Sequence, residues 1–78
     1  MMDMEDFIAN FADQFEDTDA GDIRADTAFH ELDEYSSLIA LSIMAMVDEE
    51  YDVQLTGADI RTAVTVEDLF NIVKARRA

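Results

Sequence analysis

The sequence predicts an all-α domain, a four-helix bundle with a long loop between helices one and two and a short third helix. Three observations support this class. The 78 residues include no proline and only two glycines, so little interrupts helix formation. Half of the residues are apolar, and these recur at helical spacing in separate segments. A chain of this length forms one domain, which we assign to residues 1–78.

The first helix is predicted over residues 4–16, with Asp3 as its N-cap. Five apolar residues fall on one helical face: Met4, Phe7, Ile8, Phe11 and Phe15. The three phenylalanines among them are predicted to enter the core. A loop from Asp17 to about Ser36 follows, and loops of this length are often functional. We expect three of its residues to attach it to the bundle: Phe29, Leu32 and Tyr35.

The second helix is predicted to begin after Ser36, which is a suitable N-cap, and to end at Tyr51. Between residues 38 and 47 its only polar residue is Ser42. A short third helix is predicted over residues 57–61. A last helix should begin after the N-cap Thr65, with Asp68 in a capping-box position. Its predicted buried stripe consists of Val66, Leu69, Phe70 and Val73, and its end is basic, with Lys74, Arg76 and Arg77.

The charge of the chain limits its partners. Nineteen acids against five bases give a net charge of −14, which repels nucleic acid and anionic lipid and attracts basic protein surfaces. No apolar run is long enough to span a membrane, and no basic signal peptide opens the chain, so we expect a cytoplasmic protein. There is no cysteine to act as a nucleophile or metal ligand.

Two further features have simple interpretations. The acidic segment 17–22 does not fit the spacing of a calcium-binding EF-hand, and we predict no dedicated metal site. The only histidine, His30, is expected to face solvent in the loop and to have no catalytic role.

Four short segments, taken together, carry a family resemblance. Ser36-Ser37-Leu38 opens the second helix, and Asp48-Glu49-Glu50-Tyr51-Asp52 follows about ten residues later. Upstream lies Asp26-Thr27-Ala28-Phe29-His30-Glu31-Leu32, and downstream lies Thr65-Val66-Glu67-Asp68-Leu69. In this order and spacing, over nearly the whole chain, the sequence resembles the acyl carrier protein family.

The resemblance implies a function and a modification site. Ser37 would be the serine to which a phosphopantetheinyl transferase, with magnesium, attaches phosphopantetheine. The thiol of that arm would hold acyl groups as thioesters and deliver them to fatty-acid or polyketide-type biosynthetic enzymes. The protein would be a monomeric carrier and not an enzyme. Its fold would be the four-helix bundle of acyl-carrier type.

The resemblance also implies a docking surface on the second helix. Two acids that the family usually has after the attachment serine are here Ile39 and Ser42. With Met46 they would form an uncharged outward face, while Asp48 and Glu49 would keep an acidic edge for basic patches of synthase enzymes. The inward face would consist of Leu38, Leu41, Val47 and Tyr51.

Two alternatives remain open at this stage. A peptidyl or aminoacyl carrier of a nonribosomal system would have the same fold, but its usual Gly-Gly-x-Ser-Leu run is absent before Ser37. An unmodified acidic interaction module would use Ser37 only at the start of a helix. The acyl group and the pathway stay undetermined.

Overall fold

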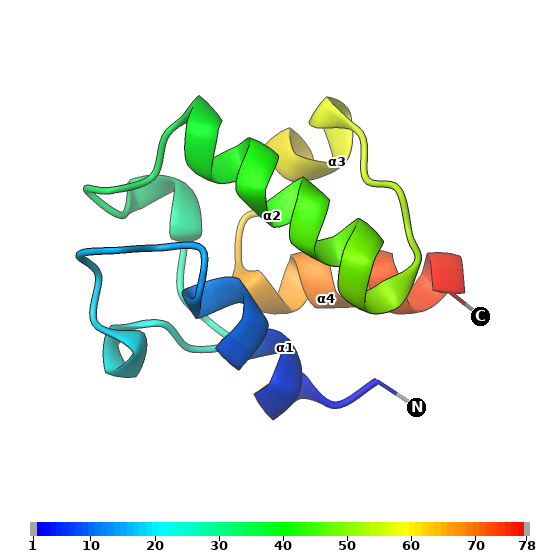
Figure 1. The fold of residues 1–78 in the computed structure, drawn as a ribbon, viewed down its shortest axis with the longest axis horizontal. Coiled ribbons are helices and arrows are strands. Elements are labelled where there is room, and N and C mark those ends of the chain that lie inside the picture. Colours follow the sequence, from blue (N-terminus) through cyan, green and yellow to red (C-terminus); the bar gives the residue numbers. More distant parts are fainter. Residues whose placement is uncertain (1, 78) are drawn as a thin grey trace.

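The computed structural model describes residues 2–77 and arranges them as four α-helices (Figure 1): α1 (Met4–Ala12), α2 (Ser37–Tyr51), α3 (Gly57–Thr62) and α4 (Val66–Arg77). Within this range there is no strand, and only an isolated bridge joins Ala28 to Thr65. The predicted all-α class, long connection and short third helix are therefore confirmed. Across residues 2–77, none of the helices combines the length and the hydropathy needed to cross a bilayer.

α1 is shorter than predicted, because it ends at Ala12 and not at residue 16. Tighter turns continue the chain: the Gln14 N–H donates to the Phe11 carbonyl at 3.1 Å, and the Phe15 N–H donates to the Ala12 carbonyl at 3.0 Å. Phe15 is therefore still directed into the core, where it is buried. Asp3 occupies the N-cap position, but its side chain makes no capping hydrogen bond.

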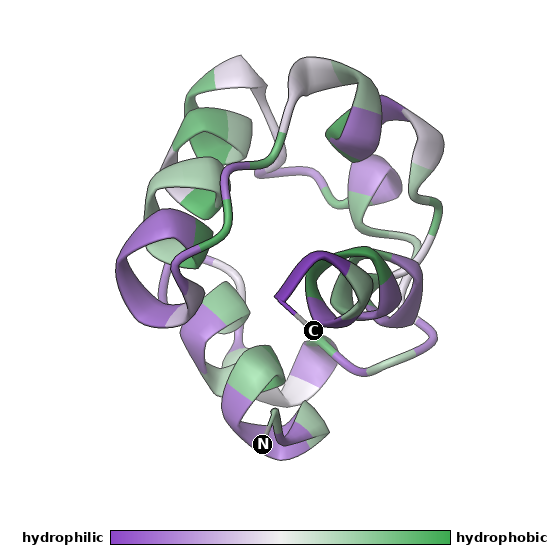
Figure 2. Cartoon of the chain, turned by 90° about the vertical axis from the view of Figure 1, so that its right-hand side faces the viewer, coloured by the Kyte–Doolittle hydropathy of each residue, from purple (hydrophilic) through white to green (hydrophobic). Residues whose placement is uncertain are grey.

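Aromatic rings from α1, α2, α4 and the long connection meet in the core, with Tyr51 contributed by α2. Phe7 of α1 contacts Phe70 of α4 edge to face, with 5.5 Å between centroids. Phe11 makes the same kind of contact, at 5.4 Å, with Phe29 of the long connection. Figure 2, which looks nearly along α4, shows that this helix carries both hydrophobic and hydrophilic residues. The buried stripe predicted for α4 is confirmed in full.

The connection between α1 and α2 is an ordered part of the fold. It contains two 3₁₀ turns, Ala20–Asp22 and Phe29–Glu31. The carbonyls of Thr27 and Ala25 accept hydrogen bonds from the first two N–H groups of α4, at 3.2 and 2.8 Å. Helix N-termini leave such donors without partners, so the connection stabilises α4 as well as covering the core. Phe29 is fully buried, while Leu32 and Tyr35 are half-buried against the core, as predicted.

Glu34 ties the start of this connection to its end. Its carboxylate accepts hydrogen bonds from the N–H groups of Glu16, Asp17 and Thr18, at 2.6, 2.9 and 2.8 Å, and from the Thr18 hydroxyl at 2.8 Å. These donors favour the ionised form, and the bond from the Glu16 N–H contributes most to lowering the pKa of Glu34. The chain that leaves α1 is thereby held beside the chain that enters α2.

Capping boxes begin both C-terminal helices. At α4 the predicted box is confirmed: the Asp68 N–H donates to the Thr65 hydroxyl at 3.1 Å, and the Thr65 N–H donates to the Asp68 carboxylate at 3.0 Å. Thr56 and Asp59 form the same arrangement at α3. The Asp59 carboxylate also accepts hydrogen bonds from Nη1 and Nη2 of Arg76, both at 2.6 Å, and this pair joins α3 to the end of α4.

Candidate functional site

Ser37 is the first residue of α2, and its side chain is exposed. The preceding residue is the N-cap: the Ser36 backbone is extended, and its hydroxyl accepts a hydrogen bond of 3.4 Å from the Ile39 N–H. The predicted role of Ser36 is therefore confirmed. The first turn of α2 contains no acid, and its first N–H groups have no partners within the helix. Ser37 thus combines an accessible hydroxyl with an N-terminus that favours a negative group.

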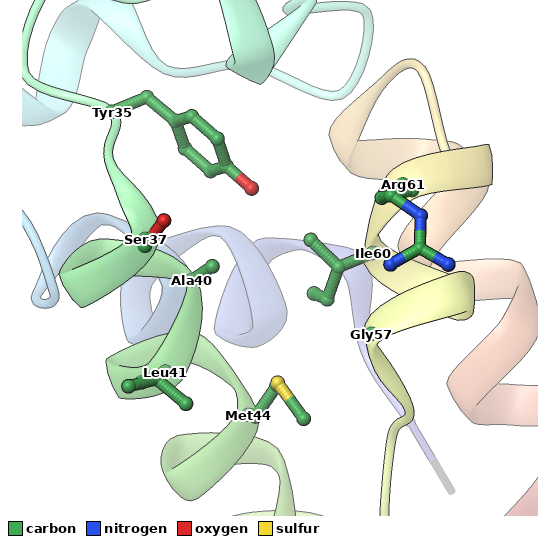
Figure 3. Close-up of a pocket in the computed structure, with 8 residues that line it drawn as sticks. All are labelled: Tyr35, Ser37, Ala40, Leu41, Met44, Gly57, Ile60 and Arg61. Carbon is green, nitrogen blue, oxygen red and sulfur yellow. The ribbon is translucent and has the colours of Figure 1, made fainter.

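A groove of about 410 Å³ lies between α2 and α3, and Ser37 is at its edge. Figure 3 shows side chains from the two helices facing each other across it, with the Tyr35 hydroxyl directed between them. Its lining combines four apolar residues with a hydroxyl, a phenol, a glycine and a guanidinium: Ala40, Leu41, Met44, Ile60, Ser37, Tyr35, Gly57 and Arg61. The groove is therefore lined by both apolar side chains and polar groups.

Tyr35 packs against two rings of the connection, that of buried Phe29 and that of exposed His30. Its ring lies 5.6 Å from that of Phe29 and 4.9 Å from that of His30, measured between centroids. Partial burial raises the pKa of Tyr35, because desolvation disfavours the phenolate. At neutral pH the phenol is therefore protonated and can donate a hydrogen bond into the groove.

His30 is exposed, as predicted, yet it also joins the connection to α3. Its Nε2 lies 2.8 Å from the Ile60 carbonyl oxygen and 2.9 Å from that of Ala63. In a tautomer that carries the proton on Nε2, this atom donates to the carbonyls at the end of α3. His30 thereby helps to position Ile60 in the groove wall, a role that the sequence did not indicate.

The predicted rotation of α2 is wrong in part. Met46, predicted to face outward, is only 6% exposed, and Ile39 and Ser42 are partly buried. Leu38 and Leu41, predicted to face inward, are 76% and 60% exposed. The aromatic core between α1 and α4 takes Ile43, Met46, Val47 and Tyr51 instead, so the inward prediction holds only for the last two.

The outward side of α2 consequently contains different residues from those predicted. We call it the outward strip, and it consists of exposed residues at helical spacing: Leu38, Leu41, Ala45, Asp48 and Glu49. Figure 2 shows hydrophobic colours along most of α2 and hydrophilic ones near its end. As predicted, the outward side of α2 is uncharged in its first half and acidic in its second. The first half consists of Leu38 and Leu41, however, and not of Ile39, Ser42 and Met46. Asp48 and Glu49 are exposed as predicted.

Comparison of the chain with protein-family models, with curated proteins and with solved structures found no significant match. Sequence reasoning identified Ser37 but not the opposite wall of the groove, which Gly57, Ile60 and Arg61 provide. The Thr56-x-x-Asp59 capping pattern could have fixed the start of α3. No local pattern could have indicated that α3 faces Ser37.

Proposed function

We propose that this protein is an acyl carrier, in which phosphopantetheine attached to Ser37 holds acyl groups as thioesters for fatty-acid or polyketide-type biosynthetic enzymes. The observation that carries the proposal is the position of Ser37, an exposed hydroxyl at a helix N-terminus and at the edge of an apolar groove. The resemblance of the four sequence segments to the acyl carrier protein family supports it independently. The structure has four helices with a long first connection. That this bundle is of the acyl-carrier type is part of the proposal.

The site fits the proposed prosthetic group. In the attachment step, Ser37 Oγ attacks the β-phosphate of coenzyme A on a transferase. A phosphodiester forms, the adenosine bisphosphate half leaves, and the hydroxyl proton passes to a base of the transferase. The new anion would lie beside the N–H groups of the first α2 turn, which contains no competing carboxylate. The arm supplies a thiol for thioester chemistry, which a chain without cysteine does not itself provide.

The remainder of the site suits a carrier better than a catalyst. The apolar residues of the groove, Ala40, Leu41, Met44 and Ile60, could cover part of an acyl chain. The outward strip offers partners an apolar contact at Leu38 and Leu41 and an acidic one at Asp48 and Glu49. We propose that synthase enzymes and the transferase approach this strip with surfaces that combine an apolar pocket with basic residues.

Intact-mass analysis after incubation with coenzyme A, magnesium and a broad-specificity transferase tests the proposal. We expect the wild-type chain to gain one phosphopantetheine and Ser37→Ala to gain none. Ser36→Ala is the matched control, because it removes the neighbouring hydroxyl and should still be modified. No gain in the wild type would favour an unmodified interaction module. A gain that survives Ser37→Ala would place the arm on another serine.

A further inference from the structure

One cation lines a groove that contains no acid. The chain has 19 acidic residues, yet none of the eight groove-lining residues within 2–77 is acidic. Arg61, on the α3 wall, supplies the only positive charge among them. An anion in the groove would therefore meet a guanidinium and no neighbouring carboxylate of the lining, although the protein as a whole repels anions.

The Arg61 guanidinium has no ionic partner in the described part of the chain. Over residues 2–77, the side chain forms neither a salt bridge nor a hydrogen bond, whereas Arg76 is paired with Asp59. The guanidinium lies close to Gly57, where an added Cβ would be 3.3 Å from Nη1. It presents five N–H donors that stay charged at any physiological pH, in a fork that matches a carboxylate.

A group tethered at Ser37 would meet Arg61 across the groove, and Figure 3 shows these residues on opposite sides of it. An exposed ion pair between Arg61 and a carboxylate that is free in solution would contribute little binding free energy. Tethering changes this, because a linked group has an effective concentration in the millimolar range for short flexible linkers. The phenol of Tyr35 offers a second donor at the same groove. Between these polar groups the lining is apolar and suits methylene groups.

We propose that the groove selects acyl groups with a terminal carboxylate, which Arg61 binds while the methylene chain contacts Met44 and Ile60. The inference rests on the proposed attachment at Ser37 and narrows the cargo to the dicarboxylic class. The same anionic chemistry has a second source, the phosphodiester of the arm itself. The experiment below separates the two.

The experiment compares four forms of the protein: apo, holo with a free thiol, and two forms whose arm ends in an amine in place of the thiol and carries hexanoyl or adipoyl as an amide. The two acyl groups match in length and differ in the terminal carboxylate. Intact mass first verifies loading on Ser37. Thermal melting and the chemical shift of the Arg61 Nε–H are then measured for each form. We expect adipoyl to raise the melting temperature by about 2–4 °C more than hexanoyl does, as a weak ion pair in a domain of this size should. The Arg61 signal should shift with adipoyl alone.

Variants identify the group responsible. In Arg61→Gln the adipoyl advantage should disappear, and in Arg61→Lys it should be reduced. Arg24→Gln is the matched control: it removes the same charge from the connection, away from the groove, and should retain the advantage. Equal melting temperatures for hexanoyl and adipoyl in the wild type would overturn the inference. The inference would also be overturned if Arg61→Gln lowered the melting temperature of the holo form with a free thiol as much as that of the adipoyl form. Arg61 would then bind the phosphodiester of the arm. Failure to load Ser37 would overturn the proposed function instead, and the mass shows this before any melt.

Discussion

Asp59 connects three parts of the structure, and its removal should weaken the α3 wall of the groove. Its carboxylate accepts a hydrogen bond from the Thr56 N–H at 2.8 Å and forms a bidentate pair with the Arg76 guanidinium of α4 at 2.6 Å. The Arg76 guanidinium is the main reason why the pKa of Asp59 falls from 3.8 to about 2. A shift of this size corresponds to at most about 2.5 kcal/mol of folding free energy at neutral pH.

The expected effect of Asp59→Ala is smaller than this limit, because the Arg76 side chain is 43% exposed and solvent screens the pair. We expect a loss of about 1–2 kcal/mol, which lowers the melting temperature by about 5–12 °C in a domain of this size. Circular dichroism melts measure it directly. Glu67→Ala is the matched control: it removes one charge in the first turn of α4, where the carboxylate has no hydrogen bond within residues 2–77.

The pH dependence provides the sharper measurement. The folded state lowers the pKa of Asp59, so it binds fewer protons than the unfolded state near pH 3. The stabilisation is therefore complete above the unfolded pKa and is lost as the pH falls through 3.8 towards 2. The difference in melting temperature between wild type and Asp59→Ala should be constant above about pH 5 and should narrow below pH 4. A difference that persists unchanged at pH 2, or one no larger than that of Glu67→Ala, would refute the reasoning.

Two further predictions concern α2 and the overall charge. In thermal melts, Leu41→Asp should have nearly unchanged stability because Leu41 is 60% exposed, whereas Met46→Asp should be unfolded because Met46 is 6% exposed. A normal melting temperature for Met46→Asp would support the rotation of α2 that was predicted from the sequence. Salt, and divalent cations more strongly, should raise the melting temperature by screening a net charge of −14, and a melting temperature independent of ionic strength would show that the acids are balanced locally.

The sequence predicted those elements whose apolar residues form a clear stripe. Phe7 and Phe11 defined the inward side of α1, and Leu69 and Val73 that of α4, because polar residues separate them along the chain. Phe15 continues the same spacing and is buried, so the pattern extended the first helix past its end at Ala12. Thr65 and Asp68 located the start of α4, since a capping box is encoded within four consecutive residues.

The same reasoning failed for α2, where Ser42 is the only polar residue between 38 and 47. A helix that is apolar on all sides contains no information about which side is buried. Tertiary contacts determine which side of α2 is buried: Met46 belongs to the core that contains the aromatic residues of α1 and α4, and Leu41 stays exposed. Arg61 was missed as part of the groove for a related reason, because the direction that α3 faces depends on Asp59, Arg76 and His30 together.

The tie made by Glu34 has a consequence for how this protein can evolve. Its bond to Thr18 spans 16 positions and turns the chain between them into a closed ring. The entropy of closing a ring grows with the logarithm of its length, about 0.6 kcal/mol per doubling, so insertions near the exposed turn Ala20–Asp22 should cost little. Ser37 lies just beyond the tie and should keep its position as the ring lengthens. The exposed turn is thus free to vary in length, while buried Phe29 and the carbonyls of Ala25 and Thr27 keep the rest of the ring on the core and the start of α2 in place.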